Sequence, residues 1–175
     1  MILPLAYYGN PILRKRAIPV EEITDDLRQL VRDMIETMES KDGLGLAAPQ
    51  VERSLRLFLV SIPKEDEHGN MKRGEPKIFI NPVFSSPSEE EVEIIEGCLS
   101  IPGIYESAWR PESIFVEAMN LKGETFKRKL SGMEARVAMH ENDHLNGALF
   151  VDRIKGKKRN RLTDLLTALK KKFSS

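Results

Sequence analysis

The sequence has little of several things that would define its class. Its one cysteine, Cys98, excludes a disulfide within the chain and fits a reducing compartment. The 27 basic side chains equal the 27 acidic ones, which argues against a dedicated DNA-binding protein. The sequence contains no apolar run near the ~20 residues that a membrane-spanning helix needs, and its start lacks the features of a signal peptide. We therefore expect a cytoplasmic protein that does not bind membranes.

What the chain does contain is enough for one folded domain. It has 175 residues, of which 41% are hydrophobic and 31% charged, an ordinary composition for a globular protein. Folding should bury roughly 70% of the unfolded chain's surface at this size, so a hydrophobic core needs no covalent support. We expect one domain over residues 1–155 and a basic C-terminal helix at 156–175 that packs on it or extends from it.

Hydrophobic spacing predicts helices near both ends of the chain and strands between them. Apolar residues at helical spacing predict a helix over 25–40 with Thr24 as its N-cap, and a leucine stripe predicts another over 158–172. The polar segments 64–75 and 85–91 indicate loops. Strand-like runs occupy residues 56–62, 77–81, 92–96, 113–119 and 125–130.

A further helix is predicted between the last strand and the C-terminal helix. Ser131 and Glu134 have the spacing of a capping box, and Gly147 follows Asn146 as a C-terminal signal. This helix should include His144. Because helices and strands do not alternate along the chain, we predict an α+β fold in which one antiparallel or mixed sheet surrounds this central helix.

The central helix carries an H-E-x-x-H pattern at His140, Glu141 and His144. The two imidazoles differ by only about 40° around the helix axis, so they can bind one metal ion. Glu141 lies about 60° to the side, where it can act on water without binding the metal. Met133 and Val137 continue the histidine face as apolar residues, which indicates that this face points into the core.

A catalytic metal needs a third protein ligand and one open position. Asp164 has a metalloprotease-like separation from His144 but falls in the leucine-striped helix, and Asp152 is placed at the start of a loop. Cys98 follows a glycine at the end of a strand, where a thiolate and a free backbone amide can face a site. A single cysteine can equally be an inert buried side chain. Spacing alone leaves the third ligand open.

A glycine-rich segment precedes the first strand, from Gly43 to Gln50. It is not a phosphate-binding loop, because no Lys-Ser/Thr pair follows and the G-x-G-x-x-G fingerprint is missing. Its small residues allow another backbone to approach closely, and Gln50 offers an amide donor. The segment is therefore a candidate for ligand contact.

Together, three segments resemble the signatures of the peptide deformylase family. These are G-x-G-x-A-A-x-Q at 43–50, E-G-C-x-S at 96–100 and H-E-x-D-H at 140–144, in the family's order. Residues 10–14, Asn-Pro-Ile-Leu-Arg, are also similar to the family's opening segment, so the resemblance covers nearly the whole chain. It implies a metal-dependent amidohydrolase that removes the formyl group from the N-terminal methionine of newly synthesised proteins and releases formate.

The resemblance also implies a role for each motif. The implied ligands of one divalent metal ion are Cys98, His140 and His144. Fe(II) is favoured, with zinc, nickel or cobalt as substitutes, although a thiolate and two imidazoles suit zinc and iron alike. Glu141 would take a proton from water and deliver it to the leaving amine. The Gln50 side chain and the Leu99 backbone N–H would stabilise the oxyanion.

The substrate implied by the resemblance is an N-formylmethionyl nascent peptide. The backbone at Gly45 would pair with this peptide as in strand addition. The expected lining of the methionine pocket is Leu44, Ile94, Met133 and Val137. Glu96 and Arg110 would form an ion pair that supports the Cys98 loop.

Three residues have roles that the resemblance leaves open. Met139 stands where the family usually has glutamine, and Arg136 where an apolar residue is common. Arg136 either narrows the pocket or extends its charged end outward. Asp143 either orients a ligand histidine or pairs with a basic neighbour.

Two other functions compete with deformylation. A metalloprotease would use a carboxylate or histidine as third ligand, so metal binding would survive substitution of Cys98. A module with a structural metal would need a fourth protein ligand, for which the sequence offers no good candidate.

The end of the chain is basic. Residues 155–172 carry eight basic side chains and one acidic one, a local charge of +7. This pattern indicates either a solvated amphipathic helix or a surface that docks on ribosomal RNA.

Overall fold

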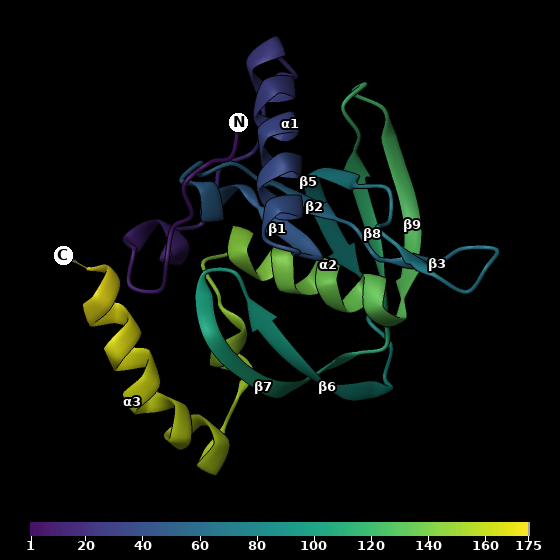
Figure 1. Ribbon diagram of the computed structural model, residues 1–175. Coiled ribbons are helices and arrows are strands. Elements are labelled where there is room, and N and C mark those ends of the chain that lie inside the picture. Colours follow the sequence, from purple (N-terminus) through teal and green to yellow (C-terminus); the bar gives the residue numbers. More distant parts are fainter. Residues whose placement is uncertain (175) are drawn as a thin grey trace.

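The structure is a computed structural model that describes residues 1–174. Within this range the chain forms three α-helices and nine β-strands (Figure 1). The helices are α1 (Asp25–Ser40), α2 (Gly132–Leu145) and α3 (Gly156–Phe173). Helix α1 has the predicted bounds, and the Thr24 hydroxyl caps it by accepting a hydrogen bond from the Leu27 backbone N–H at 3.1 Å.

The largest sheet has five strands, all paired antiparallel. Their order across the sheet is β1 (Gly45–Ala47), β2 (Leu57–Val60), β5 (Lys77–Ser85), β8 (Ser113–Met119) and β9 (Thr125–Ser131). Strand β1 has one partner, so its other edge stays available for pairing.

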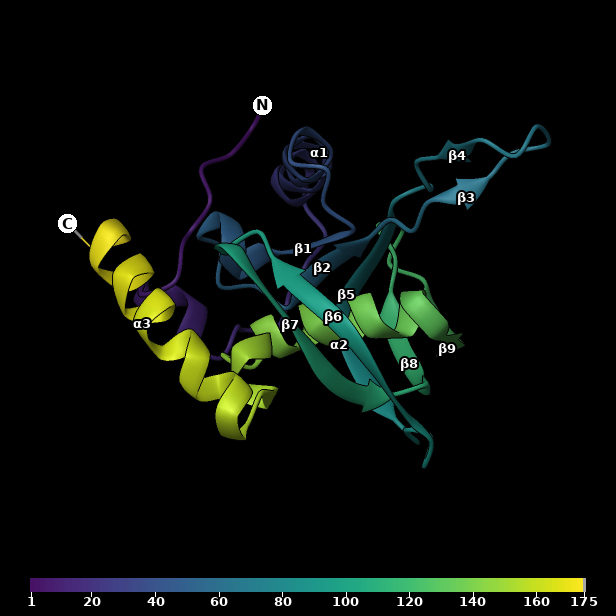
Figure 2. The ribbon, with the colours of Figure 1, turned by 60° about the horizontal axis from the view of Figure 1, so that its bottom comes forward.

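Helices α1 and α2 cover opposite faces of this sheet (Figure 2). Strand β2 is covered on both faces, since all four of its residues are buried. Phe58 and Val60 pack in one cluster with Val137 of α2, whereas Leu57 and Leu59 pack in a second cluster with α1. Adjacent residues of a strand point to opposite faces, so a run of apolar residues fits a strand buried on both sides.

A second sheet consists of β6 (Glu91–Cys98) and β7 (Ile101–Pro111), which form an antiparallel ribbon. A third pair, β3 (Lys64–Glu65) and β4 (Met71–Lys72), lies within the segment predicted as a loop. The predicted α+β fold with antiparallel strands around a central helix is confirmed, except that the strands divide among three sheets instead of one. Helix α2 runs between the five-stranded sheet and the β6–β7 ribbon (Figure 2).

The start of α2 is as predicted, but its capping is not. Ser131 is the N-cap, and its side chain makes no capping hydrogen bond. Glu134, the expected partner in a capping box, instead forms ion pairs with Lys77 at 2.7 Å and Arg128 at 2.8 Å. These contacts join the first turn of α2 to strands β5 and β9.

Helix α3 lies against the rest of the molecule through one apolar face. Leu162 and Leu166 are buried in a cluster that includes Ile101 of β7 and Phe150. At the other end of the helix the Phe173 ring stacks on Tyr7, with ring centroids 4.1 Å apart. The boundary between residues 155 and 156 stays a prediction. None of the helices within residues 1–174 has the length and apolar character needed to span a membrane.

Candidate metal centre

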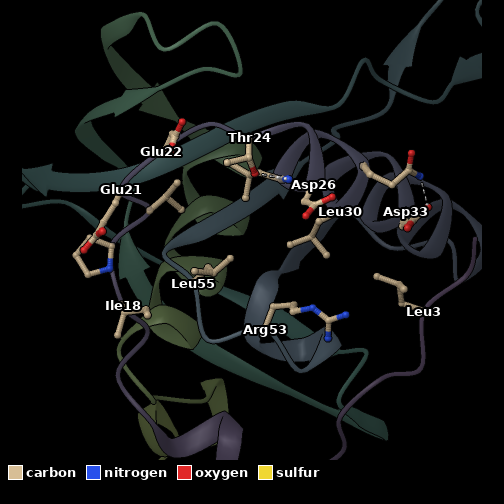
Figure 3. Close-up of a pocket in the computed structure, with 14 residues that line it drawn as sticks. Leu3, Ile18, Glu21, Glu22, Thr24, Asp26, Leu30, Asp33, Arg53 and Leu55 are labelled. Carbon is tan, nitrogen blue, oxygen red and sulfur yellow. Dashed lines mark hydrogen bonds between the residues drawn. The ribbon is translucent and has the colours of Figure 1, made fainter.

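The structure contains a cavity of about 930 Å³ on the α1 side of the five-stranded sheet (Figure 3). Apolar side chains such as Leu30 and Leu55 line it together with the carboxylates of Glu21, Glu22 and Asp26. It contains none of the predicted site residues and no histidine or cysteine, so the metal chemistry lies elsewhere.

A second cavity, of about 590 Å³, lies where β1, β6 and α2 meet. Its size is within the range of ligand sites, roughly 300–1,000 Å³. The predicted site residues that line it are Leu44, Gly45, Gln50, Glu96, Cys98, Leu99, Met133, Val137, His140 and Glu141. Segments that are far apart in the sequence therefore meet at one site.

Three potential metal ligands come together in this region. One donor atom each from Cys98, His140 and His144 lies within 4.8 Å of the others, the only such His/Cys/Asp/Glu group that residues 1–174 form. The Cys98 Sγ and the His144 Nε2 are 3.4 Å apart. Because β6 ends at Cys98 and both histidines belong to α2, the ribbon and the helix each supply part of the donor set. Three ligands leave room for one open position in a tetrahedral site.

The partners of the histidine rings favour metal binding. Glu96 Oε1 lies 2.8 Å from His140 Nδ1, so that nitrogen donates to the carboxylate and Nε2 keeps its lone pair for a metal. Burial, which disfavours the charged form, holds the pKa of His144 well below its ordinary value. A neutral His144 also presents a lone pair. The residues present therefore fit a divalent cation.

Glu141 lies in the cavity as a buried carboxylate with an unused oxygen. Among residues 1–174, its Oε1 atom has no hydrogen-bond partner. Burial, which disfavours the charged form, raises the pKa of Glu141 to about 7. A group with this pKa can both accept and donate a proton near neutral pH.

Gly45 and Gln50 are held in the cavity by close contacts. A Cβ atom at position 45 would lie 2.6 Å from Glu141 Oε2 and 2.8 Å from the Val137 side chain, so only glycine fits here. The Gln50 Oε1 accepts the Ala47 backbone N–H at 2.9 Å. The Gln50 Nε2 then donates to Ser100 Oγ at 3.1 Å and lies 3.6 Å from Cys98 Sγ, so the amide faces the metal ligands.

A buried charge network surrounds the ligands. Arg110 binds Glu96, as expected, and also donates to Asp143 at 3.0 Å. Arg136 is buried and donates to Glu96 at 2.6 Å, so it does not extend into solvent. Hydrogen bonds from His140 and Arg110 outweigh the effect of burial and hold the pKa of Glu96 well below its ordinary value.

The structure shows what Asp143 and Met139 contact, the two residues whose roles the sequence left undecided together with Arg136. Asp143 pairs with Arg110 and with Arg153, at 2.7 Å, rather than with a ligand histidine; Glu96 makes that contact instead. Met139 is buried in the apolar cluster beside α2, so its side chain serves the core.

The pocket lining differs from the expectation at one position. Ile94 does not line the cavity, whereas its neighbour Ile95 does. Adjacent side chains of a strand point to opposite faces, so an error of one residue exchanges them. The sequence analysis also missed Tyr7 and Phe173, which line the cavity from the two ends of the chain. Only their packing in the folded molecule reveals them.

Comparison with known sequences identifies relatives over most of the chain. The family model described as polypeptide deformylase matches residues 2–160. A peptide deformylase from Acinetobacter baumannii is 42% identical over 163 residues, which cover 93% of this chain and 89% of the relative.

Solved structures show the same fold. A plant peptide deformylase aligns with a TM-score of 0.89 and 36% identity, over 98% of this chain and 90% of that one. A class I type b peptide deformylase from Acinetobacter baumannii, solved with Met-Ala-Ser bound, aligns with a TM-score of 0.81 and 35% identity, over 88% of this chain and 99% of that one.

Proposed function

The chain belongs to the polypeptide deformylase family and acts as a metal-dependent peptide deformylase, and from this premise we propose how its own residues remove the formyl group from an N-terminal methionine. One observation carries the proposal. A Cys/His/His donor set lies in the same cavity as Glu141, a buried carboxylate with a free oxygen.

Cys98, His140 and His144 would hold the metal. When bound, this ion supplies Lewis-acid chemistry that lowers the pKa of water and so provides a hydroxide nucleophile near neutral pH. Glu96 keeps the His140 ring in place, and Arg110 and Arg136 keep the Glu96 carboxylate in place. The ligands are therefore positioned before the metal arrives.

Glu141 would handle the proton. Its carboxylate takes a proton from the attacking water and later delivers it to the amine nitrogen of methionine as the C–N bond breaks. Formate and a free amine are the products. The pKa near 7 that burial gives this group suits both steps.

The Gln50 Nε2 and the Leu99 backbone N–H would stabilise the negative charge on the formyl oxygen. Gln50 supports this role because its other amide atom is fixed by Ala47. Losing one such donor typically costs about 3–4 kcal/mol of transition-state stabilisation.

The substrate would bind as an added strand. Strands β1 and β6 each have a single partner, and residues of both line the cavity, so an extended peptide can pair with their free edges. Gly45 lets the peptide backbone approach. Leu44, Met133 and Val137 offer apolar surface for the methionine side chain.

The test is formate release from an N-formylmethionyl tripeptide with Glu141→Gln as the variant. We expect kcat to fall by roughly 10²–10⁴-fold while the metal content stays unchanged. Glu134→Gln, in the same helix but outside the cavity, is the matched control and should retain activity. A Glu141→Gln enzyme with normal turnover would contradict the assigned role. Cleavage of unformylated peptides would instead favour the metalloprotease alternative.

We propose Fe(II) as the native metal and the cytoplasm as the location. Both depend on Cys98 remaining a reduced thiolate, which a reducing compartment provides. Protein purified without oxygen should contain iron and lose activity in air, as measured by elemental analysis and formate release. Full activity and retained iron after exposure to air would count against Fe(II).

The proposed location is tested separately. A tagged copy of the protein found outside the cytoplasmic fraction would count against the cytoplasm.

We also propose that α3 docks on ribosomal RNA. The N-cap residue Lys155 and five cationic side chains of the helix are exposed in the structure: Lys157, Arg161, Lys170, Lys171 and Lys172. Most of the helix lies beyond the residues that match the family model. Cations aligned on one exposed element can neutralise phosphates with a strong dependence on salt.

Cosedimentation with ribosomes tests this docking. Reversing Lys170, Lys171 and Lys172 to glutamate should weaken binding and reduce its salt dependence. Reversing Lys122, Lys127 and Lys129 on the β8–β9 hairpin changes the net charge equally and should leave binding largely intact. Equal effects of the two triple variants would contradict docking through α3.

A further inference from the structure

One face of the β6–β7 ribbon exposes three large apolar side chains. Ile95, Tyr105 and Trp109 are 69%, 70% and 57% exposed. Side chains alternate along a strand, so these odd-numbered residues share a face, and Glu93 pairs with Trp109 across the ribbon. Even-numbered residues such as Glu96, Ala108 and Arg110 are buried on the opposite face. The apolar stripe of Ile95, Tyr105 and Trp109 therefore has no partner within residues 1–174.

The apolar stripe begins at the catalytic cavity. Ile95 and Tyr105 line the cavity, and Cys98 lies at the end of β6. Trp109 lies outside the lining, two residues beyond Ser107, which pairs with Ile95. At ~3.3 Å per residue, Trp109 is roughly 7 Å farther along the ribbon. The stripe thus leads outward from the metal ligands.

We propose that the apolar stripe binds the substrate beyond its first residues and recognises an extended nascent peptide through one apolar side chain, at its fifth or sixth position, that faces the ribbon. This inference rests on the proposed binding of the substrate along the edge of β6. Glu93, the position level with Trp109, lies five positions before Cys98, so a strand-like peptide needs about as many residues to reach it.

The size of the stripe favours a substrate over a second copy of the chain. A stable dimer buries about 800 Å² on each partner, far more than three partly exposed side chains offer. A small apolar contact gives weak binding, which suits an enzyme that must release its product. Glu93, which lies beside the stripe, is negatively charged. Lys158 of α3 lies 3.8 Å from its carboxylate and balances that charge.

Kinetics with matched peptides test the proposal. The substrates are an N-formylmethionyl tripeptide and two hexapeptides that add leucine or serine at positions five and six. We expect kcat/KM for the leucine hexapeptide to exceed that for the serine hexapeptide by roughly fivefold, the factor that half-burying one leucine supplies. Trp109→Ala should bring this ratio close to one. Phe115→Ala, which removes an exposed aromatic from β8, should leave the ratio unchanged.

The chain offers a second readout that does not require turnover. Trp109 is its single tryptophan, so tryptophan fluorescence reports on the stripe alone. Adding the unformylated leucine hexapeptide should shift the emission to shorter wavelength, whereas the unformylated tripeptide should not. Failure of Glu141→Gln to reduce formate release would contradict the proposed catalysis without affecting this binding measurement.

Three results would overturn the inference. The first is a ratio of kcat/KM, leucine hexapeptide to serine hexapeptide, that is the same in the unmodified protein and in Trp109→Ala. The second is an emission shift of the same size with the tripeptide and the leucine hexapeptide. The third is a dimer in sedimentation experiments that Trp109→Ala converts to monomer, which would assign the stripe to a second copy of the chain.

Discussion

Gly45 contributes to the site because, without a side chain, it leaves space for neighbouring groups. The Glu141 carboxylate and the Val137 side chain both occupy the space where a Cβ atom would be. Glycine here lets β1 approach α2 closely enough for the edge proposed to pair with the substrate and the carboxylate proposed to transfer protons to share one cavity. Glycine is therefore required here for close packing and not for an unusual backbone conformation, since the φ angle of Gly45 is not positive.

Gly45→Ala should impair catalysis more than folding. Displacing Glu141 by about 1 Å can cost 10²-fold in rate, so we expect kcat/KM for formate release to fall roughly 100-fold. Overpacking should lower the free energy of unfolding by about 1–3 kcal/mol, measured with urea. Gly69→Ala, in the β3–β4 turn at φ +80°, is the control that strains the backbone outside the cavity and should retain its rate. A Gly45→Ala enzyme with normal kcat/KM would contradict the close packing.

Asp152 and Arg14 should give the stability a dependence on pH. Burial raises the pKa of Asp152, but hydrogen bonds from Arg14 and the Leu149 backbone N–H outweigh this and lower it overall. A carboxyl group with a lowered pKa stabilises the fold above its unfolded pKa of about 3.9. That contribution disappears as the pH falls through the lower, folded value.

Asp152→Asn should therefore destabilise the protein at pH 7 and lose its effect in acid. The pair is partly exposed, so the expected change at pH 7 is only about 0.5 kcal/mol. Urea unfolding between pH 7 and pH 3 measures it, with the exposed Asp164→Asn as control. A difference from the unmodified protein that stays constant over this range would argue against the ion pair.

At the residue scale, sequence reasoning succeeds where spacing alone fixes the geometry. His140 and His144 are one turn apart on a helix, so their common orientation is predictable. The spacing could not select Cys98, because its distance from the histidines depends on how the ribbon packs against α2. The two alternatives for Arg136 stayed open for the same reason, since the carboxylate that neutralises it comes from β6 and only the folded molecule places Arg136 in the cavity lining.

At the element scale, local signals located the helices better than the strands. Strand β7 was missed because Pro102 and Gly103 suggest a turn, whereas its pairing with β6 is a long-range contact. Strand β5 continues past Pro82 because an irregularity between Ile80 and Val83 accommodates it. There the Asn81 side chain also bonds to the backbone N–H and C=O of Val20.

The N-caps of α1 and α2 allow a prediction in which each serves as the control for the other. Thr24 makes its capping hydrogen bond and Ser131 does not. Thr24→Ala should lower the free energy of unfolding by about 1 kcal/mol. Ser131→Ala should have a much smaller effect. Urea unfolding measures both, and a larger loss for Ser131→Ala than for Thr24→Ala would contradict the observed caps.

At the scale of the whole molecule, the metal ligands join two separate layers. Cys98 belongs to the ribbon and both histidines belong to α2. A metal that binds only the folded chain should stabilise it by about 2.7 kcal/mol at 100 times the dissociation constant. We expect zinc to raise Tm and a chelator to reverse the rise, as followed by circular dichroism. Cys98→Ala should reduce the rise strongly, and an unchanged rise would contradict the assigned donor set.

The contact between Tyr7 and Phe173 sets an order of events during synthesis. Tyr7 is synthesised well before Phe173, yet their stacked rings line the same cavity. Every metal ligand precedes residue 145 in the chain. A growing copy of the enzyme therefore acquires its full donor set while one wall of the cavity is still missing, and that wall is completed only once Phe173 has been synthesised.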